Sequence, residues 1–380
     1  MIKSPNFTWR KAPVALYLVM AVCATPFFLG VLRLAQRAYN DTTRDLNAVL
    51  CAGNAWIHGE SFYADFNACP YQMNWPYVYP PPLAMAMGVL ERNYSTSFGP
   101  LLAGAALGLS LTAMARLLLT GKLTEQIFRA PFYCAITAKT LVSGNFSLLV
   151  HALVVLGAAN AAFDLLLPPL VVVCAVCKPT LAVYAALFLF MDRPLLTRLA
   201  MTGASLAGVL CYFAWFRLDD PATFQAWLDA VRVHGAAVPG HSFFGLPGVA
   251  ALPAVVRAGL YVAFSAALLA VGLVASRRVA GAGRERMFIG VAVCALLNPR
   301  MLFYDQITLP FGMGVIAAHL ASGSRRRTVV VGFGLAVIWG CVTGWSGQTG
   351  AEILFASCVG LISACALLPA KADDAAQKAG

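Results

Sequence analysis

Hydrophobic residues run along this chain in long blocks, and polar residues are confined to the gaps between the blocks. The blocks are rich in Leu, Ala, Val and Gly and lack the alternation of membrane β-strands, so we expect helices throughout. The candidate spans cover residues 12–35, 82–91, 97–119, 128–143, 145–162, 165–177, 180–191, 198–216, 254–275, 286–299, 305–322, 328–346 and 350–369. This pattern predicts an all-α, polytopic transmembrane helix bundle with about 10 to 13 spans.

Several of these helices are too short to cross about 30 Å of hydrocarbon alone. The short helices meet at Gly144-Asn145 and at Lys178-Pro179, where the pattern predicts turns between half-length helices. Broken helices are tolerated in membranes where they border a cavity rather than lipid. We therefore expect both turns to line a cavity.

Composition excludes an ordinary soluble domain. Only 11% of the 380 residues are charged and 60% are hydrophobic, whereas soluble domains carry about 25% charged residues. The net charge of +11 raises the question of a nucleic-acid partner. The basic residues form no patch interleaved with aromatic side chains, so we expect no nucleic acid and attribute the charge to membrane orientation.

Basic residues gather in short loops, and the positive-inside rule places such loops in the cytoplasm. They are Lys3, Arg10, Lys11, Arg193, Arg198, Arg277, Arg278, Arg284, Arg286, Arg325 to Arg327, Lys371 and Lys378. Residues 1–369 are thus predicted to form a single integral membrane domain, followed by a cytoplasmic tail at 370–380. Both termini are then cytoplasmic, and the long polar loops at 36–80 and 217–253 are extracytoplasmic.

Most of the 11 cysteines lie in apolar blocks, where a thiol packs as a small hydrophobic group. Cys51 and Cys69 differ, because both lie in the first outer loop, where oxidation is possible. A bridge and two free thiols are both open at this point. The sequence contains no HExxH, no paired CxxC, no phosphate-cradling Gly-rich loop and no GxSxG motif, so we expect neither a metal site nor nucleotide chemistry.

Candidate chemistry begins with Asp45, which follows the first span at the water boundary. A helical pattern continues from it to Gly53 and suits an interfacial helix of the first outer loop. Such a helix would hold one carboxylate above a membrane cavity. The alternative is that Asp45 caps this helix, and Asp41 competes for both roles.

Other polar groups occur near the same predicted face. A lysine between two apolar helices, as Lys178 is, is costly unless it meets an anion; snorkelling to the interface is the alternative. Arg300 and Asp305 flank the mouth of a short helix, and an ion pair between them is the competing account. Tyr79 precedes Pro80 to Pro82, which fix an extended backbone. A rigid loop end is the simpler interpretation, and it does not exclude that the motif lines the site.

Several short motifs occur in an order that is similar to a known family. They are Asp45-Leu46, Ala52-Gly53-Asn54-Ala55, Gly59, Tyr63, Tyr79-Pro80-Pro81, Gly144-Asn145, Lys178-Pro179, Ser242-Phe243-Phe244-Gly245, Asn298-Pro299 and Tyr304-Asp305. Together they resemble glycosyltransferase family 87, polytopic enzymes of the GT-C fold that use polyprenyl-phosphate sugars and are best known as α-1,2-mannosyltransferases. The likeness covers residues 12 to 345. Members often have Gly-Gln where this chain has Gly144, and many have paired histidines at the position of Tyr304-Asp305.

The resemblance implies an inverting glycosyltransferase that moves a mannose-like hexose from a polyprenyl-phosphate carrier to an extracytoplasmic acceptor hydroxyl. Asp45 matches the proposed catalytic base of the family. The donor phosphate would meet Lys178, Arg300, Arg44 and His241, and the pocket would include Tyr79, Asn145, Tyr304 and Asp305. No cofactor is implied beyond the lipid-linked donor; the partners are a lipid or glycan acceptor and membrane lipids. The expected location is the bacterial plasma membrane.

Two other classes of protein fit the same pattern. A transporter or flippase of a lipid-linked or small solute would share the spans, and its path could include Lys178 and Asp305. The absence of an internal repeat argues against it. A non-catalytic scaffold of a cell-envelope complex is the third class. A lone loop histidine such as His241 can equally be a surface residue.

Overall fold

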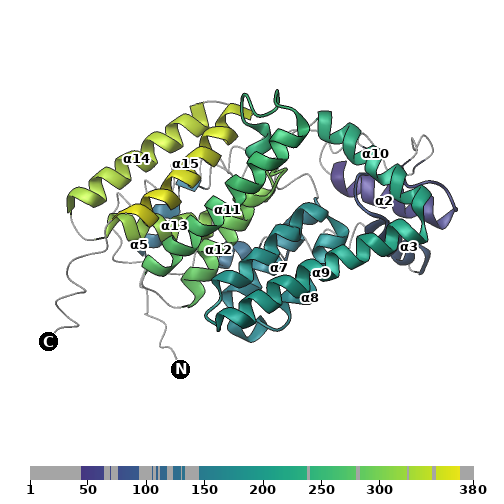
Figure 1. Cartoon of the computed structure of the whole chain (residues 1–380), viewed down its shortest axis with the longest axis horizontal. Coiled ribbons are helices and arrows are strands. Elements are labelled where there is room, and N and C mark those ends of the chain that lie inside the picture. Colours follow the sequence, from purple (N-terminus) through teal and green to yellow (C-terminus); the bar gives the residue numbers. More distant parts are fainter. Residues whose placement is uncertain are drawn as a thin grey trace.

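The computed structural model describes residues 44–63, 69, 76–93, 105, 108–109, 112–117, 123–129, 131–132, 145–237, 240–279, 283–322, 325–344 and 348–368. Within these ranges every regular element is a helix, which confirms the all-α prediction. The α-helices are α2 (Arg44–Ile57), α3 (Pro81–Asn93), α5 (Leu123–Arg129), α7 (Phe146–Ala159), α8 (Leu167–Cys177), α9 (Leu195–Asp219), α10 (Pro221–Ala237), α11 (Ala254–Arg278), α12 (Gly283–Leu297), α13 (Leu309–Ala321), α14 (Arg325–Gly344) and α15 (Gln348–Leu367). Short 3₁₀ segments are η4 (Ala161–Phe163), η5 (Pro179–Phe190), η6 (Phe243–Gly245) and η7 (Asp305–Thr308). Figure 1 shows their arrangement.

Three helices of the described chain, α9, α11 and α15, are long and apolar enough to cross a membrane. The first two have 25 residues each, about 37 Å at a rise of 1.5 Å per residue. These helices support a membrane protein, while the larger number of spans and the GT-C arrangement stay predictions. The predicted span at 12–35, most of those at 97–119 and 128–143, and the tail at 370–380 lie outside the described residues.

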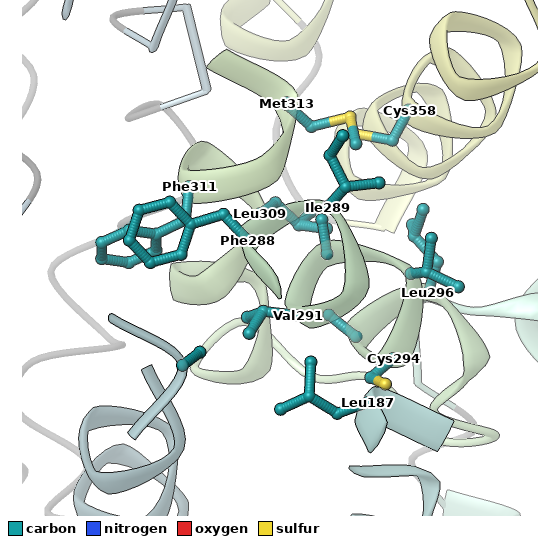
Figure 2. Close-up of a cluster of buried hydrophobic side chains, with 14 of the residues drawn as sticks. Leu187, Phe288, Ile289, Val291, Cys294, Leu296, Leu309, Phe311, Met313 and Cys358 are labelled. Atoms are coloured by element: carbon teal, nitrogen blue, oxygen red, sulfur yellow. The ribbon is translucent and has the colours of Figure 1, made fainter. Parts of the chain in front are cut away.

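The core is built around α12 and α13. Figure 2 shows Phe288 and Ile289 of α12 beside Leu309 and Phe311 of α13. Every residue from Met287 to Leu297 is buried, because α12 is apolar on all sides and has no face to offer to water. The rings of Phe288 and Phe311 lie 5.5 Å apart across the two helices. Gly312 lies so close to the backbone of α12 that any side chain would clash there. Close backbone packing therefore fixes this inner pair.

Helices α2 and α3 pack against each other. In Figure 1 this pair lies beside α10, at the end of the molecule away from α14 and α15. The predicted span at 82–91 forms α3, which has 13 residues and measures about 20 Å, too short to cross hydrocarbon alone. The pair touches through glycines: a Cβ on Gly53 would come within 2.8 Å of the Gly88 nitrogen. Asn54 also donates a hydrogen bond of 3.2 Å to Glu91. These contacts hold the second half of α2 against α3.

The sequence predicts helix breaks at Lys178-Pro179 and at Gly144-Asn145. Helix α8 ends at Cys177, Lys178 has an extended backbone (φ −148°, ψ 99°), and Pro179 opens η5. This confirms the turn at Lys178-Pro179, since proline cannot donate the hydrogen bond that would continue the helix. Helix α7 starts directly after Asn145, whose side chain accepts a 2.9 Å bond from the Ser147 N–H. Gly144 lies outside the described residues.

Cys51 and Cys69 are joined by a disulfide, with their Cα atoms 5.6 Å apart. The bridge ties α2 to a later part of the first loop. Disulfides are typical of oxidising compartments; the extracytoplasmic position of residues 36–80 stays a prediction.

Replacing both bridged cysteines by serine should lower the free energy of unfolding by about 3 kcal/mol, given the length of the closed loop. Thiol labelling of denatured protein should reach Cys51 and Cys69 only after reduction. The control is Cys211→Ser, which removes an exposed free thiol and should leave stability unchanged. Labelling of Cys51 or Cys69 without reduction would rule the bridge out.

Candidate functional site

Asp45 lies inside the first turn of α2, so it is not the N-cap residue that the alternative interpretation required. Its Oδ2 accepts a 2.8 Å hydrogen bond from the side-chain amide of Asn145. The same amide nitrogen lies 2.9 Å from the hydroxyl of Tyr79. Three of the sequence-predicted site residues, from three distant segments, therefore meet at one point.

Tyr79 is fixed by the loop that carries it. The Tyr63 hydroxyl donates to the Tyr79 carbonyl at 3.0 Å, and the Tyr77 hydroxyl donates to the Pro80 carbonyl at 2.7 Å. Tyr77 and Tyr79 are buried against apolar residues of α2 and α3. The prolines thus both stiffen the loop and present Tyr79 to Asn145, so the two interpretations of this motif hold together.

Lys178 is buried rather than extended to an interface, so the snorkelling alternative is wrong. Its ammonium donates to Ser147 Oγ at 2.6 Å and to Asp305 Oδ1 at 3.3 Å. It also lies 4.6 Å from the centre of the Tyr304 ring, as in a cation–π contact. The helix break at Lys178 therefore directs a cation into the protein.

Asp305 is fully buried and takes part in a second set of contacts. His151 Nε2 lies 2.8 Å from Asp305 Oδ1, and the Leu302 N–H donates to Oδ2 at 2.8 Å. The Tyr184 hydroxyl lies 2.7 Å from the other ring nitrogen of His151. In the described chain the ion pair of Asp305 is thus with Lys178, and the pairing with Arg300 considered from the sequence is wrong.

Sequence reasoning missed three of these polar residues, namely Ser147, His151 and Tyr184. His151 offered a usable signal, since an ionisable residue within an apolar helix marks a functional site by default. The other two carry hydroxyls that are common in apolar helices, so their pattern held no such signal.

Arg300 and His241 lie on the loops beyond this network. The Arg300 guanidinium donates to the His234 carbonyl at 3.4 Å, and its charge acts on Asp45. His241 is buried, with its ring 4.3 Å from that of Phe303, so the surface alternative is wrong. Burial, and next the charge of Arg300, lower the pKa of His234 to about 4, so this imidazole is neutral near pH 7. Arg44 opens α2, but its side chain is not among the described groups.

Burial raises the pKa of the Asp45 carboxyl above its ordinary value. The hydrogen bond from Asn145 and then the positive charges of Lys178 and Arg300 lower this pKa, but they do not offset the burial. The negative charge of Asp305 adds to the raised pKa. The result is a carboxylate that is a better proton acceptor than an exposed aspartate, with two cations within electrostatic reach.

Replacing Asn145 should shift the acid side of any Asp45-dependent activity to higher pH, because the hydrogen bond that lowers the pKa of Asp45 is lost. The base works only while ionised, so activity falls as pH falls through this raised pKa. Asn145→Ser can still cap α7, whereas Asn145→Ala also loses the cap, about 1 kcal/mol. Full pH–rate profiles of both variants check this, and Asn160→Ala, which loses a cap at η4, is the control. If the acid side of the pH–rate profile stayed at the same pH in both variants, Asn145 would not control the pKa of Asp45.

The described residues contain no group of three or more His, Cys, Asp or Glu side chains that could hold a metal ion. Comparison of the chain with family models, with curated proteins and with solved structures finds no match. What the site offers chemically is the Asp45 carboxylate held by Asn145, a second buried carboxylate, Asp305, paired with Lys178, and the nearby charge of Arg300.

Proposed function

We infer that this chain is a polyprenyl-phosphate-sugar-dependent glycosyltransferase that inverts the configuration of the transferred hexose. One observation carries the proposal: the Asp45 carboxylate is held by Asn145 at the start of α7, within electrostatic range of Lys178 and Arg300. A lone base beside cations suits a reaction in which a hydroxyl loses a proton while a phosphate leaves.

The reaction would be a single displacement. The acceptor oxygen attacks C1 of the sugar and passes its proton to Asp45, while the bond from C1 to the phosphate oxygen breaks and its electron pair leaves with the polyprenyl phosphate. Oδ2 of Asp45 is occupied by Asn145, so Oδ1 is the oxygen that would take the proton. A single carboxylate suffices because the leaving phosphate needs no protonation by an acid, unlike the leaving group of a glycosidase.

The phosphate gains negative charge as it leaves, so cations facing it would stabilise the transition state. Lys178 has the Ser147 hydroxyl and the Asp305 carboxylate as fixed partners, which hold the ammonium in place before the donor binds. Such preorganisation avoids the cost of reorienting a flexible side chain during the reaction. Asp305 and His151 would act here as positioning residues.

A transporter is the second candidate, and one observation favours it. Asp305, His151 and Lys178 form a buried ionisable cluster of a kind found in proton-coupled transporters. Such a protein would move its solute across a membrane and leave every covalent bond of the solute intact.

One experiment distinguishes the glycosyltransferase from the transporter. Purified protein in vesicles is given a radiolabelled polyprenyl-phosphate hexose together with a lipid extract from envelope membranes as acceptor. The transferase predicts a new glycolipid whose anomeric configuration is opposite to that of the donor. Movement of labelled donor between leaflets, with no product formed, would favour the transporter and remove the proposal.

A further inference from the structure

A small hollow lies far from Asp45 along the chain, where η5, α9, α11 and α12 meet. Its volume is about 90 Å³, enough for a phosphate group but not for a whole lipid. Its polar lining residues are Asp192, Arg193, Arg198, Ser276, Arg277 and Arg286. Four arginines thus face one aspartate. Arg193 precedes α9, and the other three arginines lie near the ends of α9, α11 and α12 that the positive-inside rule predicts to be cytoplasmic.

Two of the arginines, Arg198 and Arg286, each have a buried N–H group with no hydrogen-bond acceptor among the described residues. Arg198 gives one N–H to the Leu189 carbonyl at 2.7 Å, and Arg286 gives one to Asp192 at 3.4 Å. The Nε atoms of both side chains are buried, with no acceptor among the described residues. A buried donor without an acceptor costs about 1–3 kcal/mol, and an anion that reached either Nε atom would recover part of that cost.

The arginine side chains of the hollow favour a phosphate ester as the bound anion. Guanidinium groups present planar pairs of donors that match two phosphate oxygens at once. Arg193 already donates from Nε and Nη2 to a single oxygen, Oδ2 of Asp164, at 3.3 and 2.9 Å. Arg198, Arg277 and Arg286 therefore remain as the charges that outweigh Asp192.

The surroundings favour a lipid over a free phosphate. The first two turns of α9 expose Leu195, Leu196 and Leu199, and the end of α11 exposes Val274. These apolar side chains continue the lipid-facing surface of two helices that are long enough to span a membrane. The hollow thus opens where acyl chains end and head groups begin, which is the place where basic pockets between helices bind anionic lipids.

We propose that the hollow lined by Arg198, Arg277 and Arg286 binds the phosphate head group of an anionic phospholipid at the cytoplasmic side of the membrane. The site is separate from the Asp45 site and does not depend on the proposed transferase activity.

The test measures binding of short-chain phosphatidylglycerol, of short-chain phosphatidylcholine and of inorganic phosphate to the purified full-length protein in a neutral detergent. Phosphatidylglycerol should bind at least about tenfold more tightly than phosphatidylcholine, a difference of about 1.4 kcal/mol. Millimolar inorganic phosphate should compete for the site but bind more weakly, because it lacks the acyl chains. Inorganic phosphate that binds as tightly as the lipid would overturn the lipid assignment.

The double variant Arg198→Gln, Arg286→Gln should lose the preference for phosphatidylglycerol. The matched control, Arg326→Gln with Arg327→Gln, removes two charges from the first turn of α14, another predicted cytoplasmic helix end, and should keep the preference. Equal losses in both variants would mean a general charge effect and would overturn the site. If the glutamine variant does not fold, Arg198→Lys with Arg286→Lys keeps the charge and loses the planar donors. Unchanged lipid preference in that variant would also count against the proposal.

Discussion

Asp45→Asn should lower the rate of sugar transfer by about 10²- to 10⁴-fold, the usual contribution of a general base. The substitution keeps the size of the side chain and an oxygen that can accept from Asn145, but it removes the group that takes the proton. Donor binding should change little, since the carboxylate does not hold the phosphate. Initial rates with saturating donor, together with a donor dissociation constant, separate the two effects.

The control for this variant is Glu60→Gln, which removes an exposed carboxylate from the same loop. It should transfer sugar at the wild-type rate. Asp41→Asn is a second comparison, because Asp41 competes with Asp45 as the base on sequence grounds. A normal rate in Asp45→Asn with a large loss in Asp41→Asn would move the catalytic role to Asp41.

Asp305→Ala should lower the free energy of unfolding by about 3–5 kcal/mol, because it leaves Lys178 charged and buried without its carboxylate partner. Asp305 is 1% exposed and the Lys178 side chain is 11% exposed, so water cannot replace the lost interaction. His151 also loses its partner in this variant. Thermal unfolding in detergent measures the effect.

Two matched variants show whether the loss of stability in Asp305→Ala comes from the buried ion pair. Asp229→Ala breaks an exposed ion pair with Arg232 and should cost at most about 1 kcal/mol. Lys178→Met combined with Asp305→Leu removes both charges and should recover much of the stability while abolishing donor binding. Asp305→Ala that is no less stable than Asp229→Ala would show that the buried pair does not hold the site together.

Local features of the site could be predicted from the sequence because they depend on nearby residues. The helix after Asp45 follows from its amphipathic pattern, and the break at Lys178 follows from Pro179. The block at 82–91 was predicted as a span by its apolar composition. It forms α3, which packs on α2 through Gly53 and Gly88, a close approach that only the folded chain reveals.

The side-chain pairs were not predictable, because they join residues far apart in the sequence. Asn145 meets Asp45 across 100 positions, and His151 meets Asp305 across 154. Which groups meet depends on where the start of α7 lies relative to α2 and on how α7 packs against η7, and no local pattern encodes that arrangement. The sequence predicts Asp305 in the site and offers an ion pair with the nearer Arg300 as the competing account, but it does not indicate the partners Lys178 and His151.

The most direct test of the central claim is a density map of the protein bound to a non-cleavable phosphonate analogue of a polyprenyl-phosphate hexose. The account predicts the phosphonate within hydrogen-bond distance of Lys178 or Arg300 and the sugar C1 on the side of Asp45. An analogue bound with its phosphonate away from both cations, or with its sugar out of reach of Asp45, would contradict it.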